Sequence, residues 1–412
     1  MTPNYKTTRL SCYTGYVTQA ITVNLAPLLF VIFQEKFQLS LAFIALIPLI
    51  TFLIQIIIDA AAIVFVEKVS YRALAVSSQL TSFAGLVLLS LLPQIIEPRI
   101  GIIIAILVYS SGSALAEVVM SPLVDALPQE AGSGSAMTFL HSFYSWGQAF
   151  VILVTTVVLK AIGGDLWTLI PYMWAVIPFI NTIAFMKVPM PETAVHDSEH
   201  IVWKMLLKPS FVIAFFMMIC AGAAEQVVAQ WTSMFAEVGL GVSKIVGDIV
   251  GPCAFAVLMA LGRMGHGLFG GRLNMKKLLL ALSAFTVLCY LIIVFSPVPI
   301  VSLIGCGLCG IGVSVMWPGM LSLCSKNYPG AGASMFAILA LGGDIGCSVG
   351  PYLSGSVSDA AATSRFFSQM AETFSLTPEQ LGLRLGFAAA VIFPVMMLLG
   401  ISLLKNEVTN KK

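Results

Sequence analysis

The chain has 412 residues with a formal net charge of +2, and 58% of its residues are hydrophobic whereas only 10% are charged. Because a soluble globular protein carries about 25% charged residues, this composition excludes an ordinary soluble domain. Apolar runs of about 20 residues recur along the whole length, and each can cross a hydrocarbon core of about 30 Å. The composition therefore predicts a protein embedded in the lipid bilayer.

Twelve membrane spans are predicted, and each is expected to be an α-helix because lipid offers no partners for backbone polar groups. In chain order the spans cover residues 11–34, 41–66, 73–96, 100–127, 135–160, 167–187, 209–237, 245–269, 275–296, 299–325, 333–357 and 381–404. Lysine and arginine are more frequent on the side that would hold both termini. This bias predicts a multi-pass protein of the plasma membrane (the bacterial inner membrane) with both termini in the cytoplasm.

The two halves of the chain resemble each other weakly. The longest polar cytoplasmic segment, 188–208, lies near the midpoint, with six predicted spans on each side. The matched positions and segments are Asp59 with Arg263, MSP (120–122) with MWP (316–318), and SAM (135–137) with ASM (333–335). The repeat predicts an N-terminal six-helix bundle over 1–187, a cytoplasmic linker over 188–208 and a C-terminal six-helix bundle over 209–412. Parallel six-helix halves around a central site are an architecture of transporters.

This arrangement resembles the major facilitator superfamily over essentially the whole chain. The superfamily's loop signature between its second and third helices is present only in degenerate form, as VEKVSYR (66–72). The segment GSALAEVVMSPLVDALP (112–128) is similar to the fourth helix of the fucose permease group of proton-coupled sugar symporters. VNLAPLLF (23–30) resembles that group's first helix, with Asn24 present and the following acidic residue missing. The resemblance implies an all-α fold of two pseudo-symmetric bundles, with a small-molecule solute and protons as partners.

Glu117 is the best candidate for a proton carrier. A charge at mid-membrane costs at least about 2.5 to 3.5 kcal/mol to insert, so such residues usually face the bundle interior, pair or act. Ser110, Ser113 and Ser121 recur with Glu117 at helical spacing and form one polar stripe. Glu117 lies about 15 Å from the cytoplasmic end of its helix, which suits a group that loads and releases a proton. The alternative is a structural acid held by a hydroxyl group or by His141.

A second polar stripe is predicted in SAMTFLHSFYSWGQ (135–148). At 100° per residue, His141, Tyr144 and Gln148 fall on one side of the helix, and Trp146 falls on the other. The polar side is expected to face the cavity, with His141 as a modulator of proton transfer. The alternative for His141 is a histidine packed in the bundle core.

Amide and aromatic side chains are the predicted solute contacts. Amides offer both a donor and an acceptor to sugar hydroxyls, and indole rings offer a stacking surface. The predicted solute-binding residues are Gln19, Asn24, Tyr144, Gln148, Gln226, Gln230, Trp231 and Trp317. The alternatives are hydrogen bonds between helices for the glutamines and a lipid-facing or interfacial position for the tryptophans.

Three further charged residues are predicted to act in gating. Asp59 and Arg263 occupy equivalent places in the two halves, each about two turns from the cytoplasmic end of its helix. They are expected to latch the cytoplasmic side, together with Asp344, and the alternative is an anchoring role for the solute. Asp344 lies in the glycine-rich segment LALGGDIGCSVGP (339–351), which allows close approach of a neighbouring helix.

The sequence contains no phosphate-binding loop, HExxH motif or nucleophile elbow, so we expect no enzyme activity. The eight cysteines are expected to be packing residues, and no metal, cofactor or nucleic acid is expected. The leading hypothesis is a secondary active transporter that moves a small polar solute, a sugar, in symport with protons by alternating access, functional as a monomer. The alternatives are a proton-coupled antiporter exporting amphipathic compounds and a sensor that does not transport. Sodium remains open as the coupling ion.

Overall fold

The computed structural model describes residues 5–65, 69–125, 127, 136–191, 208–269, 274–327 and 332–404. These residues are almost entirely helical, and none of them lies in a strand. The helices of the first half are α1 (Lys6–Leu28), α2 (Phe30–Phe37), α3 (Leu41–Phe65), α4 (Tyr71–Ile95), α5 (Pro98–Asp125), α6 (Ala136–Ile162), η2 (Gly164–Leu166) and α7 (Leu169–Lys187). Those of the second half are α9 (Pro209–Met234), η3 (Phe235–Gly239), α10 (Lys244–Asp248), η4 (Ile249–Cys253), α11 (Ala254–Phe269), α12 (Met275–Phe295), α13 (Pro299–Val313), α14 (Met316–Asn327), α15 (Gly332–Thr363), α16 (Arg365–Thr373), α17 (Pro378–Ala390) and α18 (Ile392–Leu403).

The helices are long and apolar enough for a multi-pass membrane protein. Among the described residues, ten helices can cross a membrane, or eleven if the bent pair α1 and α2 forms one span. The bend of 45° follows Pro27, which removes a backbone donor from the last turn of α1. The expected all-α membrane architecture is confirmed. The expected number of twelve spans is not reached, because α15, which covers the predicted span 333–357, is not among the candidate spans.

Contacts divide the chain into two compact units. Unit 1 comprises Met1–Leu39 and Ile50–Val195, and unit 2 comprises Ser40–Leu49 and His196–Lys412. The division falls within the predicted linker 188–208. The sequence does not predict that the start of α3 belongs to unit 2.

The start of α3 joins unit 2 through contacts with α15. The backbone N–H of Ala42 donates to Asp359 Oδ1 at 3.1 Å, and Ser348 Oγ donates to the carbonyl of Leu49 at 3.2 Å. These two bonds tie the start of α3 to α15 at points about three turns of helix apart.

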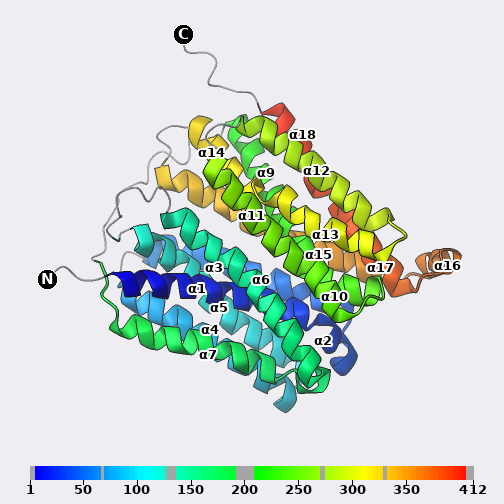
Figure 1. Ribbon diagram of the computed structural model, residues 1–412, viewed down its shortest axis with the longest axis horizontal. Coiled ribbons are helices and arrows are strands. Elements are labelled where there is room, and N and C mark those ends of the chain that lie inside the picture. The colour runs from blue at the N-terminus through cyan, green and yellow to red at the C-terminus, as the bar shows by residue number, and fades with distance from the viewer. Residues whose placement is uncertain are drawn as a thin grey trace, which may run out of the picture. The chain divides into compact units, whose positions relative to one another are not determined.

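Unit 1 is a bundle in which α4 packs against α5 and α7, and α1 packs against α5 and α6 (Figure 1). Its core includes Tyr16 of α1, Leu74 of α4, Met120 of α5 and Phe185 of α7, all buried. Because α1 contacts both α5 and α6, polar side chains on these three helices can meet inside the unit.

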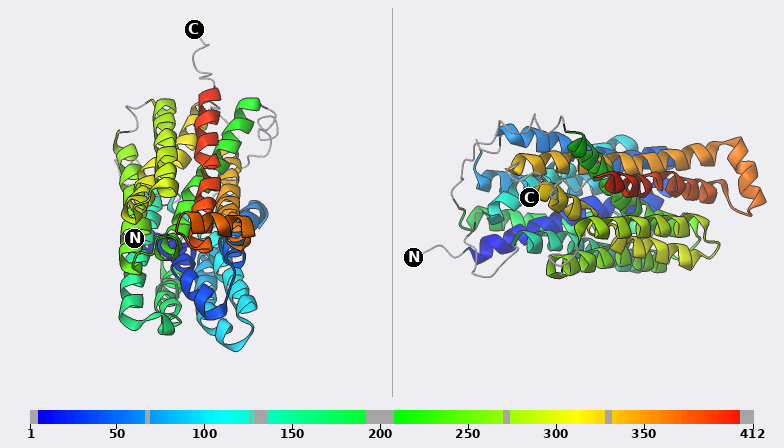
Figure 2. Two further views of the ribbon diagram at one scale, coloured as in Figure 1. Left: turned by 90° about the vertical axis from the view of Figure 1, so that its right-hand side faces the viewer. Right: turned by 90° about the horizontal axis from the view of Figure 1, so that it is seen from above.

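Unit 2 is built around close contacts of α15 with α9 and α17, and of α13 with α11 and α12 (Figure 2). Glycines permit these contacts. A methyl group at Gly346 of α15 would run into the carbonyl oxygen of Ile219 and lie 2.8 Å from the backbone nitrogen of Ala223, both on α9. The predicted close approach at the glycine-rich segment of α15 is therefore present.

Replacing Gly346 with alanine is expected to destabilise the protein by about 1 to 3 kcal/mol, because α9 and α15 would have to separate. Thermal unfolding of the purified protein in detergent measures the effect. Gly265→Ala in α11 is the matched control, since a methyl group there meets nothing within 4 Å. It should be neutral or stabilising by up to about 1 kcal/mol. Equal melting temperatures for Gly346→Ala and the unmodified protein would contradict the role of this contact.

Candidate functional site

The structure joins Glu117 of α5 to Gln19 of α1. Gln19 Nε2 donates a hydrogen bond to Glu117 Oε2 at 2.6 Å. Gln19 is buried and Glu117 is half-buried. A residue predicted to bind solute therefore contacts the residue predicted to carry a proton, which provides a direct route for one event to affect the other.

Asp59 of α3 lies near the same carboxyl group. Gln55 Nε2, one turn earlier on α3, donates to both Asp59 oxygens at 3.0 and 3.2 Å. Asp59 is also close enough to Glu117 for the two carboxyl groups to interact electrostatically.

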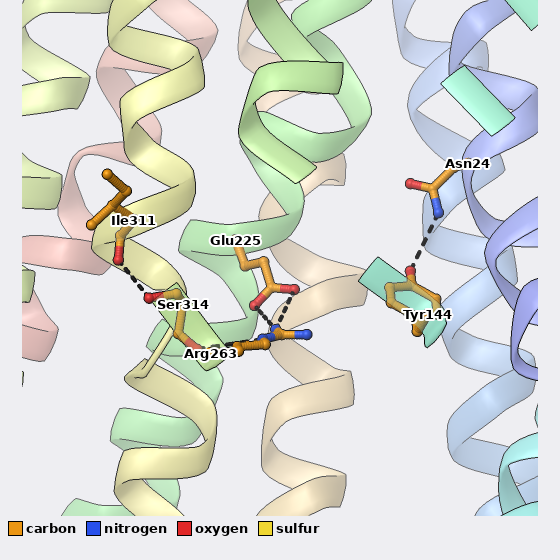
Figure 3. Close-up of polar contacts among 6 residues, drawn as sticks. All are labelled: Asn24, Tyr144, Glu225, Arg263, Ile311 and Ser314. Atoms are coloured by element: carbon orange, nitrogen blue, oxygen red, sulfur yellow. Dashed lines mark hydrogen bonds and ion pairs between the residues drawn. The ribbon is translucent and has the colours of Figure 1, made fainter. Parts of the chain in front are cut away.

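Asn24 of α1 and Tyr144 of α6 form a second polar contact in unit 1. Asn24 Nδ2 donates to the Tyr144 hydroxyl over a long distance of 3.4 Å and to the carbonyl of Ala20 at 2.9 Å (Figure 3). Asn24 is buried and Tyr144 is half-buried. The predicted polar side of α6 thus faces α1 at this point.

Three buried polar side chains of unit 1 have an oxygen with no hydrogen-bond partner among the described residues. They are Ser110 and Ser113 of α5, and Gln148 of α6, whose Oε1 is the atom concerned. Each of these residues is at most 2% exposed. A buried polar group left without a partner costs about 1 to 3 kcal/mol, so these oxygens are well suited to accept or share hydrogen bonds with a polar ligand.

We call Gln19, Asn24, Glu117, Tyr144 and Gln148 the unit 1 polar group. Hydrogen bonds join four of these residues in two pairs, Gln19 with Glu117 and Asn24 with Tyr144, and Gln148 follows Tyr144 by about one turn of α6. The side chain of His141, a further predicted member, lies outside the described residues.

The predicted amide face of unit 2 lies on α9. Gln230 Nε2 donates to Gln226 Oε1 at 3.2 Å, and both residues are buried. The two amides therefore satisfy part of each other's hydrogen-bonding capacity, in line with the alternative of structural bonding and without excluding a solute.

The two tryptophans predicted to stack on solute differ in their surroundings. Trp231 of α9 is 1% exposed, donates from Nε1 to the carbonyl of Pro351 at 2.9 Å and packs against Gly355. Its ring is thus enclosed within unit 2. Trp317 of α14 is half-buried and packs against Gly343, next to the buried Asp344.

Arg263 of α11 pairs with Glu225 of α9, a contact that the sequence does not predict. Arg263 Nη2 lies 3.2 and 3.1 Å from the two carboxylate oxygens of Glu225 (Figure 3). Arg263 Nε also donates to the carbonyl of Ser314 at 3.4 Å, at the break between α13 and α14. One guanidinium group therefore connects three segments of unit 2.

A family model described as Major Facilitator Superfamily matches residues 12–351. The chain belongs to the Major Facilitator Superfamily. The resemblance found in the sequence is thereby confirmed, and the superfamily points to a transporter rather than an enzyme.

Solved structures of transporters share this superfamily fold. A mutant of the nucleoside transporter NupG superposes with a TM-score of 0.76 at 12% identity, covering 96% of this chain and 99% of that chain. A D-xylose-proton symporter superposes with a TM-score of 0.75 at 12% identity, covering 97% of each chain. A mutant of the E. coli fucose:proton symporter FucP gives a TM-score of 0.57 at 16% identity, covering 95% of this chain and 99% of that chain. These identities show the fold alone, and no curated protein matches the chain.

Unit 2 of this superfamily member also contains an ion network that sequence reasoning missed. Asp248 is fully buried, accepts a hydrogen bond from Ser233 Oγ at 2.5 Å and lies 3.4 Å from Lys244 Nζ. Lys244 also lies 3.7 Å from Glu237. The spacing of four residues between Lys244 and Asp248 on one helix was the available signal.

Two π-helical segments, η3 and η4, flank this network. A π-helical turn widens a helix locally and occurs frequently at functional sites. Here Glu237 lies within η3, directly after α9, and Asp248 is the last residue before η4. The network therefore fixes the connection between α9 and α11.

Proposed function

We propose that this protein is a secondary active transporter that moves a small polar solute in symport with protons by alternating access. A sugar is the leading candidate for the solute. The observation that carries the proposal is the hydrogen bond from Gln19 to Glu117 in unit 1. It supports a scheme in which a change of charge on Glu117 alters the hydrogen bonds that Gln19 can offer.

In this scheme Glu117 carries the proton. A protonated carboxyl group is a donor as well as an acceptor, whereas the ionised form only accepts. Gln19 donates to the ionised form, and protonation weakens this hydrogen bond because the acceptor loses its charge, so the Gln19 amide becomes more available to the solute. Asp59 biases this step through its charge, and we propose that His141 modulates it.

The remaining members of the unit 1 polar group would contact the solute. Asn24, Tyr144 and Gln148 offer amide and hydroxyl groups that match the alternating donors and acceptors of a polyhydroxylated compound. Gln226 and Gln230 are the proposed contacts from unit 2, and Trp317 the proposed stacking residue. Trp231 is not among the proposed solute contacts, because its ring is enclosed by packing within unit 2.

The proposed setting is the plasma membrane, with both termini in the cytoplasm and a monomer as the working unit. Arg263 is proposed to hold α9 and α11 together through Glu225, and Asp59 and Arg263 keep their proposed gating role. Asp344 also keeps its proposed gating role, supported by its burial.

A binding screen followed by uptake tests the function. Purified protein is screened for thermal stabilisation by sugars, polyols, nucleosides, amino acids and organic acids at two pH values. The stabilising solute is then offered to proteoliposomes with an inward proton gradient. Accumulation driven by the gradient supports symport. Stabilisation only by amphipathic compounds, with efflux against their gradient, would favour the antiporter instead.

Tyr144→Phe is expected to weaken binding of the solute identified in this screen by roughly fivefold to a hundredfold, because about 1 to 3 kcal/mol is lost when a buried partner is left unpaired. Isothermal titration of the purified protein measures the change. Trp146→Phe is the matched control on the same helix, since Trp146 is 41% exposed and faces away from the polar side. Unchanged affinity in Tyr144→Phe would remove Tyr144 from the solute contacts.

A further inference from the structure

The short helix α16, Arg365–Thr373, lies in unit 2 directly before a candidate membrane span. It follows α15, which ends at Thr363, and precedes the candidate span Pro378–Leu403, which contains α17 and α18. Figure 1 and the right-hand view of Figure 2 show α16, in orange, running across the end of α15 and turning back toward α17. Its position in the chain therefore places it at the boundary between the bilayer and water.

Apolar and polar residues are completely separated around α16. At 100° per residue, the apolar side chains fall within an arc of about 140°, and the polar side chains fill the remainder of the circumference. The apolar residues are Phe366, Phe367, Met370, Ala371 and, directly after the helix, Phe374. The polar residues are Arg365, Ser368, Gln369, Glu372 and Thr373.

Only part of the apolar face of α16 is buried against the rest of unit 2. Ala371 is fully buried, whereas Phe366 is 68% and Phe374 is 61% exposed. Phe366 packs its ring edge-on against Phe367, with 5.2 Å between the ring centroids. Transfer of an aromatic side chain out of water is favourable, so water is an unfavourable environment for the exposed rings.

The lipid bilayer is the partner that best matches the chemistry of this apolar face. The next element in the chain is itself a candidate membrane span with exposed apolar side chains, where Ile392 is 54% and Leu399 is 51% exposed. The polar face of α16 carries one basic and one acidic residue, Arg365 and Glu372, so it has no net charge to attract anionic headgroups or a charged protein.

We propose that α16 is an interfacial helix that lies in the plane of the membrane, with Phe366, Met370 and Phe374 inserted at the acyl-chain boundary. Helices of this kind bury the apolar face about 5 to 10 Å into the boundary region. Because α16 also packs against α17, its insertion would fix the depth at which the span Pro378–Leu403 enters the membrane.

Spin labels test the depth of insertion. Single cysteines replace Phe366, Phe374 or Glu372 in the full chain, which is reconstituted in phosphatidylcholine nanodiscs. Glu372→Cys is the matched control, since position 372 lies opposite the centre of the apolar face. Seven of the eight native cysteines are buried, and the labelled parent protein gives the background.

Power saturation should show that labels at 366 and 374 are more accessible to oxygen than to the water-soluble chelate Ni-EDDA. The label at 372 should show the reverse. Adding anionic lipid or raising the salt concentration should leave these ratios unchanged. Equal access of the chelate to all three positions would overturn the proposal. Protection of 366 and 374 from both reagents, with dipolar coupling between labels, would overturn it in favour of a second copy of the chain.

Discussion

Replacing Glu117 with glutamine is expected to abolish proton-driven accumulation of solute while leaving exchange of solute across the membrane intact. The amide retains the shape of the side chain and can still accept the hydrogen bond from Gln19. It cannot bind or release a proton. Solute should therefore equilibrate across the membrane and not rise above its external concentration.

Proteoliposomes provide both measurements. Uptake under an inward proton gradient measures accumulation, and counterflow of labelled solute without a gradient measures exchange. Glu97→Gln is the matched control. Glu97 lies directly before α5, far along the chain from Glu117, and its side chain forms an exposed pair with Arg99. It should accumulate solute like the unmodified protein. If Glu117→Gln accumulates solute equally well, Glu117 does not carry the proton.

Breaking the pair between Glu225 and Arg263 is expected to give the largest loss of stability of any single change proposed for this protein. The side chains are 10% and 22% exposed, so removal of one partner leaves a largely buried charge without compensation. Such a change costs about 3 to 5 kcal/mol, and the partial exposure of Arg263 favours the lower end of this range. Glu225→Ala and Arg263→Ala should therefore both melt at clearly lower temperatures.

A double substitution distinguishes the contribution of the ion pair to stability from that of side-chain packing. Glu225→Leu combined with Arg263→Met removes both charges and retains much of the volume, and should recover most of the lost stability. Lys36→Gln serves as the surface control, because its partner Asp165 is almost fully exposed. It should melt like the unmodified protein. A double variant less stable than both single variants would contradict the account.

Hydropathy predicted the class of fold because lipid leaves a spanning chain little choice except a helix. The positions of most spans follow from it, as in α4 and α12. The breaks do not. The bend after Pro27, the interruption at Ser314 and the π-helical turns η3 and η4 arise from local packing, which hydropathy does not register. The transfer of Ser40–Leu49 to unit 2 depends on contacts far apart in sequence.

Helical spacing predicted which polar residues share one face, but not which helix each face meets. The stripe on α5 was predicted from spacing, whereas the partner of Glu117 depends on how α1 packs against α5. The position of Glu225, about 100° from the amide face of α9, was a usable signal. The structure pairs Glu225 with Arg263, away from that face. The periodicity of α16 was equally visible but lies between the predicted spans.

Solute-dependent proton movement tests the central claim most directly. Proteoliposomes containing the unmodified protein are suspended in weak buffer without any ion gradient, and the stabilising solute is added outside while external pH is recorded. Symport predicts that external pH rises, because protons enter with the solute, and that Glu117→Gln shows no change. A fall in external pH, or solute entry with no proton movement, would contradict the account.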